Sequence, residues 1–259
     1  MSSWFYLVYF SFRRQLRPRR LAVALLLCIL ISGVVVVLGI ERSWSAKRFI
    51  RAIIEPPFCR FFLPVIALTF GTAVLGDERE DKTLVYLSTR PLPRWSLFLA
   101  KVLGSVPLVL GAALGTLLVL CSTASLGGGL PLPLLEMVWV FAPTVICSSL
   151  AYLAFFSWLG AAFRSATLLG VAYVFLVEFF MGNVPGVLKQ VSISFYLRSM
   201  LYDAVKGLDV EPRQWGGGVF QLELIEEGSD AALVLVFVAA GFLLLGMYWF
   251  SRSEYRDLT

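Results

Sequence analysis

The charged stretch Gly76-Asp-Glu-Arg-Glu-Asp-Lys-Thr-Leu-Val-Tyr-Leu-Ser-Thr-Arg-Pro-Leu-Pro-Arg-Trp95 lies between two long apolar segments, residues 61–75 and 97–121. It is the densest cluster of charged side chains in the sequence. Charged side chains are costly inside hydrocarbon because they lose their hydration there. The stretch therefore predicts a loop at the membrane surface that joins two membrane-spanning helices and is open to soluble partners.

The composition indicates an integral membrane protein. Hydrophobic residues make up 59% of the 259 residues and charged residues 15%, whereas soluble domains carry about 25% charged residues. The mean hydropathy is +0.82. The net charge of +5 comes from cations beside apolar segments, where lipid headgroups account for them better than a nucleic acid does. We therefore expect no nucleic-acid partner.

The residue types needed for most catalytic or metal sites are scarce. The sequence has no histidine, which removes the commonest general base and the commonest metal ligand. Its four cysteines are scattered in or near apolar segments and form no Cys-x-x-Cys pair, so they predict neither a metal site nor a disulfide framework. We expect them to be small buried residues.

Six apolar segments have the composition of membrane-spanning helices. They are residues 21–40, 58–76, 97–122, 135–159, 167–181 and 231–250. We expect an all-α fold with one transmembrane domain over residues 1–259, in which residues 182–230 form an extracytoplasmic connection with one or two short helices at 187–205. Gly111 and Gly115 offer a small-residue face for helix packing.

Two further segments predict helices in the membrane interface. In residues 1–20, apolar side chains including Phe5 and Tyr9 share one helical face and arginines share the other, with an end near Pro18. The alternative for this segment is a frayed tail with stop-transfer cations. Residues 41–57 show a similar division and predict a second interfacial helix that ends at Pro56-Pro57.

The loop charges favour a cytoplasmic location for both termini. More than half of the 22 Lys and Arg residues fall on the cytoplasmic side in this N-in/C-in arrangement. The cations between Arg42 and Arg60 oppose it, because they flank the first span on the outer side. The bias towards this topology is therefore modest.

The charged stretch is not a nucleotide site, although it resembles a P-loop in part. Asp81 replaces the second glycine of that motif, and the surrounding carboxylates would repel a triphosphate. The acidic residues from Asp77 are instead favourable at the start of a short helix that Pro91 would end. Leu84 and Leu87 would form a small apolar patch for a soluble partner; an ordinary solvated loop is the alternative.

The pattern Glu-Arg-Glu-x-x-Thr-Leu-x-x-Leu-x-x-x-Pro-Leu-x-Arg at 78–94, followed by Lys101, resembles the signature of permease subunits of type-2 ATP-binding cassette (ABC) exporters. The resemblance extends over nearly the whole chain: an N-terminal interfacial helix, six spans, an acidic loop after span two, and Glu178 late in span five. The chain differs in carrying Lys82 where glycine is usual before Thr-Leu.

This resemblance implies a non-catalytic subunit of a transporter in the inner membrane of a prokaryote. ATP and Mg would be bound by separate ABC ATPase subunits, and this chain would bind no cofactor. A second permease subunit, identical or related, would complete the substrate path. The residues implied to couple to the ATPase are Glu78, Arg79, Glu80, Thr83, Leu84 and Leu87.

Glu178 needs a reason to lie within an apolar segment, since a carboxylate costs about 2.5–3.5 kcal/mol at the centre of a span. It either lines the substrate path or is a hydrogen-bonded structural carboxylate.

Two other functions of the protein remain open. A membrane-embedded hydrolase is disfavoured by the absence of histidine and of aspartate within the predicted spans. A membrane anchor or assembly factor could use the charged loop to recruit a partner.

Overall fold

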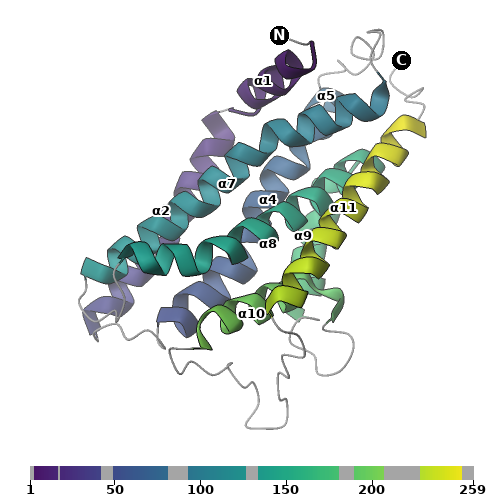
Figure 1. Ribbon diagram of the computed structural model, residues 1–259. Helices are drawn as coiled ribbons and strands as arrows, with labels where there is room; N and C mark the ends of the chain where they lie inside the picture. The colour runs from purple at the N-terminus through teal and green to yellow at the C-terminus, as the bar shows by residue number, and fades with distance from the viewer. Residues whose placement is uncertain are drawn as a thin grey trace.

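The computed structural model describes residues 3–16, 18–41, 49–80, 93–126, 134–180, 190–206 and 228–252, and these residues form a bundle of long helices (Figure 1). The predicted all-α fold is confirmed for them. Within these described ranges, five helices are long and apolar enough to cross a membrane. The first and the last described residues lie at the same end of the bundle (Figure 1).

The first span forms the edge of the bundle. It lies in α2 (Pro18–Glu41), which begins at Pro18, a favourable first residue because its missing N–H needs no helical partner. Only 17% of its most apolar window is buried, and Leu25 and Ile29 are 62% and 70% exposed. This helix therefore presents most of its apolar side chains to lipid or to another protein.

The second span differs most from the prediction. A π-helix, η1 (Ile50–Phe62), continues into α4 (Leu63–Gly71) and α5 (Ala73–Glu80). Pro56 and Pro57 lie inside η1 and do not end it. The predicted second interfacial helix is therefore wrong for residues 50–57, and residues 42–48 lie outside the described residues. The apolar face of this segment is buried against protein, as Ile50 and Ile53 show at 0% exposure.

The acidic residues after span two continue that span. Residues 77–80 extend α5 rather than starting a separate helix at Asp77. A helix continues easily through Asp and Glu residues once it is formed, so the local preference of carboxylates for a helix start does not decide the outcome here. The remainder of the charged stretch, residues 81–92, lies outside the described part of the chain.

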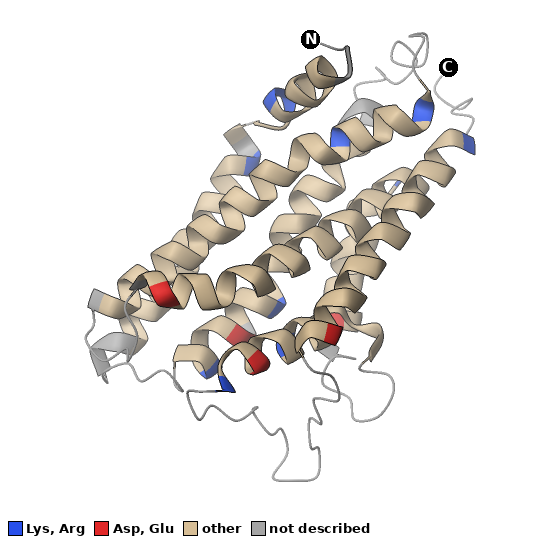
Figure 2. Cartoon of the chain, viewed as in Figure 1, with Lys and Arg blue, Asp and Glu red and all other residues tan. Residues whose placement is uncertain are grey.

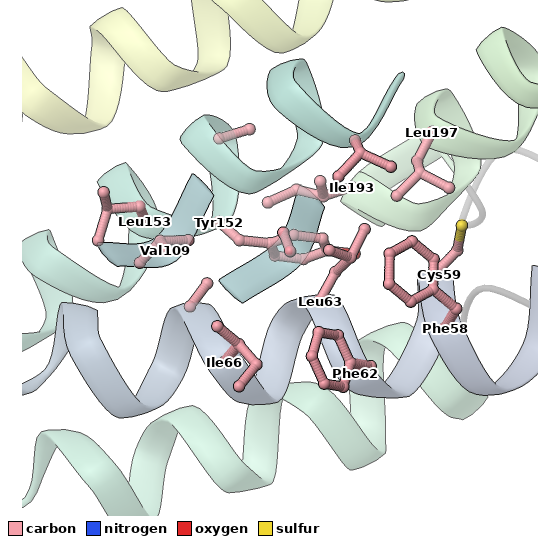
Figure 3. Packing of buried hydrophobic residues seen from close by; sticks show 14 of the residues in the cluster. Phe58, Cys59, Phe62, Leu63, Ile66, Val109, Tyr152, Leu153, Ile193 and Leu197 are labelled. Carbon is pink, nitrogen blue, oxygen red and sulfur yellow. The ribbon is translucent and has the colours of Figure 1, made fainter. Parts of the chain in front are cut away.

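The core is built around α8 (Leu134–Ala162), which contacts α4, α7 (Arg94–Leu126) and α11 (Gly228–Arg252). In the second span, 78% of the most apolar window is buried. Figure 3 shows its side chains Phe58, Phe62 and Ile66 in a row beside Tyr152 and Leu153 of α8. The helices approach closely where side chains are small: a Cβ on Gly71 would lie 2.7 Å from that of Phe156.

The fifth span is short and changes its helical type. It comprises α9 (Ala166–Tyr173) and a second π-helix, η2 (Val174–Phe180). The apolar helix Ala166–Glu178 falls short of the length of the other five. The next described helix, α10 (Ile193–Ala204), confirms the prediction of a short helix within 187–205.

The N-terminal segment forms α1 (Ser3–Gln15), which packs against the start of α7. Gly104 permits this contact, because a Cβ there would lie 2.9 Å from the Cβ of Ser11. Phe5 and Tyr9 are 60% and 59% exposed. The predicted amphipathic helix is thus present, and it buries the side of Leu7, Ser11 and Gln15 while its aromatic side chains face outward.

Candidate functional site

The helix α10 lies at the end of the bundle away from the chain termini (Figure 1). With 12 residues it is too short to cross a membrane. It packs against η1, α8 and α11. Ile193, Leu197 and Leu201 are each at most 5% exposed, and Figure 3 shows the first two beside Phe58 and Cys59 of η1. Its burial makes α10 part of the core rather than a surface helix.

Glu178 of η2 holds the N-terminus of α10. Its carboxylate is 0% exposed and accepts hydrogen bonds from the Ile193 N–H at 3.2 Å and the Ser194 N–H at 3.1 Å. The hydroxyls of Tyr173 and Ser192 donate to its two oxygens, each at 2.8 Å. Tyr173 lies at the end of α9, and the other three donors lie at the start of α10.

This carboxylate takes the place of an N-cap side chain. The N-cap residue Ser192 makes no capping hydrogen bond to the helix backbone; its hydroxyl donates to Glu178 and is also hydrogen-bonded to the Ser194 hydroxyl at 2.6 Å. A negative charge at a helix N-terminus is stabilised by the unpaired N–H groups and by the helix dipole. Glu178 thereby satisfies backbone donors that would otherwise be buried without partners.

A second buried carboxylate, Glu55 of η1, holds the middle of α10. It is 1% exposed. Its Oε1 lies 3.0 Å from Nη2 of Arg60 and 3.0 Å from Nε of Arg198, and its Oε2 accepts a hydrogen bond from the hydroxyl of Tyr202. We call these four residues the Glu55 cluster.

The Glu55 cluster contains two guanidinium groups and one carboxylate. Arg198 is 1% exposed. Burial, and then the nearby positive charge of Arg60, lower the pKa of Arg198 to about 10, so Arg198 is protonated at neutral pH. Within the described residues, its Nη2 atom makes no hydrogen bond. The Glu55 carboxylate therefore offsets part of the cost of burying Arg198 beside a second cation.

Sequence reasoning found Glu178 but missed the Glu55 cluster. Glu55 falls within Ile53-Ile-Glu-Pro-Pro-Phe58, and Arg198 within Phe195-Tyr-Leu-Arg-Ser-Met200. A lone charge inside each apolar run was the available signal, since such charges need a partner. The assignment of residues 41–57 to the membrane interface hid this signal, because an interfacial carboxylate needs none.

The predicted coupling residues lie at the opposite end of the bundle or outside the described residues. Glu78, Arg79 and Glu80 fall in the last turn of α5, whereas Thr83, Leu84 and Leu87 lie outside the part that the structure describes. The α5 end of the bundle also carries the cations at the end of α1, the start of α7 and the end of α11 (Figure 2). The described carboxylates gather at the α10 end (Figure 2).

Comparison with known families decides what kind of protein this is. The family model described as ABC-2 family transporter protein matches residues 11–255. The chain belongs to the ABC-2 transporter family. This confirms the resemblance to type-2 ABC permeases that the sequence showed, and it makes the chain a membrane component of an ABC transporter, with an ABC ATPase as its partner class. Among curated proteins, none matches this sequence significantly.

In this ABC-2 family permease, both ends of the bundle carry charged residues. The α5 end carries cations on three described helices and the acidic last turn of α5, and the α10 end carries buried carboxylates that, with Arg60 and Arg198, fix a short helix. Among the described residues, no group of three or more Cys, Asp or Glu side chains is placed to hold a metal ion. The described site therefore consists of hydrogen bonds and ion pairs that position α10.

Proposed function

We propose that this ABC-2 permease is the membrane subunit of an exporter that works with separate ATPase subunits. The match to the ABC-2 family over residues 11–255 carries the proposal. The ATPases bind ATP and Mg, and their movement reaches the spans through the end of α5 and the loop that follows. The contacts on the permease side are Glu78, Arg79, Glu80, Thr83, Leu84 and Leu87.

Six crossings with both termini in the cytoplasm support this role. The sixth crossing is α9 with η2, which joins the five longer helices. The cations that α1, α7 and α11 carry at one end of the bundle support this orientation, because cytoplasmic loops are enriched in Lys and Arg. A second permease subunit faces this one, and the exposed apolar side chains of α2 and α11 contact it or the lipid of a prokaryotic inner membrane.

We assign Glu178 a positioning role. Four hydrogen bonds occupy its carboxylate and leave α10 attached to η2. The substrate path then runs past a helix that Glu178 holds in place, rather than past the carboxylate itself. This role explains the buried charge without requiring a charged cargo.

Capture of an ATPase tests the proposed function. Detergent-solubilised permease should bring down a P-loop ATPase, and Glu80→Lys should release it because the change reverses a charge at the proposed contact. Glu136→Lys, at the start of α8 on the opposite end, is the matched control and should retain the ATPase. Capture of another protein in its place, with no ATPase, would favour a membrane anchor.

A further inference from the structure

The contact between α10 and η1 differs from the other contacts of α10. This helix packs more extensively against α11 and α8 than against η1. Its Asp203 lies against Gly228, the first residue of α11, where a Cβ would be 2.6 Å from Oδ2 of the carboxylate. Glu178 fastens the other end of α10 to η2 by accepting backbone hydrogen bonds. The helix α10 is therefore tied more firmly to η2, α8 and α11 than to η1.

The Glu55 cluster supplies the polar connections between η1 and α10. Glu55 of η1 binds Arg198 and Tyr202 of α10. Buried charges lose their hydration, and their mutual attraction returns only part of that cost. Nη2 of Arg198 makes no hydrogen bond within the described residues. If the helices separate, water can reach this nitrogen and the Glu55 carboxylate. The charged pair therefore makes separation less costly than an apolar contact in the same place would.

The surroundings of the pair permit such a movement. Pro56 and Pro57 directly follow Glu55 inside η1, and a helix bends most easily where proline removes backbone hydrogen bonds. Lys206, just after α10, is 77% exposed, so this end of the bundle borders water. Cys59 of η1 is 1% exposed and lies beside Leu197 of α10 (Figure 3). Separation of the two helices would uncover the Cys59 thiol.

We propose that the contact between η1 and α10 is a gate of the transport path, which opens when Glu55 and Arg198 separate and closes when they pair again. Residues 50–55 of η1 bend away at Pro56-Pro57, while α10 stays with η2, α8 and α11. The gate rests on the proposed transport function, because an exporter needs a path that opens and closes.

Labelling of Cys59 with a maleimide tests the gate without a known substrate. The parent protein keeps Cys59 as its single cysteine, and a matched control keeps Cys121 of α7; alanine replaces the other three native cysteines in each. Both thiols are buried, at 1% and 0% exposure. Because the gate opens in the folded permease, the purified parent should react at least about tenfold faster than the Cys121 control.

Variants of the charged pair should change the Cys59 reaction in opposite directions. Glu55→Leu leaves Arg198 without its carboxylate and should speed the reaction at least about tenfold. Adding Arg198→Met replaces the pair with an apolar contact. This double variant should react about tenfold more slowly than the parent, because opening no longer restores hydration to two charges. The same double variant in the Cys121 control should leave the rate unchanged, which shows that the fold is not loosened.

The ATPase supplies the link to transport. In the complex of the permease with its captured ATPase, ATP and Mg should speed the reaction of Cys59 at least about tenfold and leave that of Cys121 unchanged. If no ATPase is captured, the proposed function fails, and the labelling of the permease alone still decides whether the contact opens.

Three results would overturn the gate. One is a parallel change of the Cys59 and Cys121 rates in every variant, which would show that the contact opens only when the protein unfolds. Another is a faster Cys59 reaction in the double variant than in the parent, which would give the pair a purely structural role. The third is an unchanged Cys59 rate while a captured ATPase hydrolyses ATP, which would show that transport does not use this contact.

Discussion

At the scale of single residues, two carboxylates account for the position of α10. Glu178 binds the N-terminal backbone of this helix, and Glu55 binds Arg198 and Tyr202 further along it. Both carboxylates come from segments that lie within or next to membrane spans. The burial of each carboxylate is tolerated because several donors bind it. Removing one of these donors or the carboxylate therefore also destabilises the groups that remain.

Glu178→Gln should lower the thermal stability of the permease. The amide has one acceptor oxygen in place of two, and loses the charge that favours the helix N-terminus, so a loss of about 1–3 kcal/mol is expected. Glu136→Gln, an exposed carboxylate in the first turn of α8, should have little effect. Melting in detergent measures both. If Glu178→Gln melts at the wild-type temperature but no longer exports substrate, Glu178 lines the substrate path instead.

Glu55→Leu should destabilise the protein more than its size suggests. It leaves the buried guanidinium of Arg198 near Arg60 without the Glu55 carboxylate, and breaking a buried pair in this way costs about 3–5 kcal/mol. Adding Arg198→Met to Glu55→Leu should recover a large part of the loss, because the most buried cation is then removed as well. Thermal melting of the two single variants and the double variant gives the coupling energy. If the stability losses of the two single variants simply add in the double variant, Glu55 and Arg198 do not stabilise each other.

At the scale of elements, packing decides which glycines matter. The small-residue face predicted at Gly111 and Gly115 makes no close contact, since a Cβ at either position would have nothing within 4 Å. Gly104, about two turns before Gly111 in α7, meets α1 closely. The motif spacing alone could not distinguish these glycines, because it does not reveal which side of α7 the other helices cover.

Gly104→Val should detach α1 from α7, whereas Gly111→Val on the same helix should not. The valine side chain at 104 would overlap Ser11 and the backbone of Phe12, and overpacking of this kind costs about 1–3 kcal/mol. Trypsin cleavage at Arg13 and Arg14 in detergent reports the release of α1. Equal cleavage of the two variants would show that α1 is held by other contacts.

The spans and a short helix within 187–205 were largely predictable from the sequence, and the burial of that helix, α10, against η1 was not. Uninterrupted apolar length identifies α2, α7, α8 and α11 without any knowledge of their neighbours. The segment at 50–57 was assigned to the membrane interface because local charge and Pro56-Pro57 suggested an end. This segment is instead buried in the bundle, where Glu55 pairs with Arg198, a residue far along the chain. Local pattern carries no information about such a contact.

At the scale of the whole molecule, described cations lie at both ends of the bundle. They lie at the end with α1 and the end of α11 and also beside the described carboxylates at the α10 end (Figure 2). At the α10 end, Arg60 and Arg198 pair with Glu55 and are largely buried. Since Lys and Arg are retained on the cytoplasmic side during insertion, the cations on α1, α7 and α11 favour a cytoplasmic location for the termini. The loop charges of the sequence favoured the same topology only modestly, because the cations between Arg42 and Arg60 flank the first span on the outer side; one of them, Arg60, is largely buried, with its side chain 12% exposed.

Cysteine labelling tests this orientation. In a background without the four native cysteines, Lys206→Cys should react with a membrane-impermeant maleimide added outside intact cells, since Lys206 is 77% exposed at the α10 end. Arg252→Cys and Ser88→Cys should react only after the membrane is opened. Labelling of Ser88→Cys from outside would invert the topology and remove the charged loop from any cytoplasmic ATPase.

The Glu55 cluster also determines the order in which parts of the permease assemble during synthesis. Glu55 enters the membrane with the second span, but Tyr202 follows 147 residues later in the chain. During synthesis, Glu55 therefore lacks the Tyr202 hydrogen bond until three further apolar helices have been made. The end of the bundle that contains α10 can form only after η2 has been made, so the nascent permease completes this end late. Truncated chains that lack α10 keep the pair of Glu55 with Arg60 but leave this carboxylate without Arg198 and Tyr202.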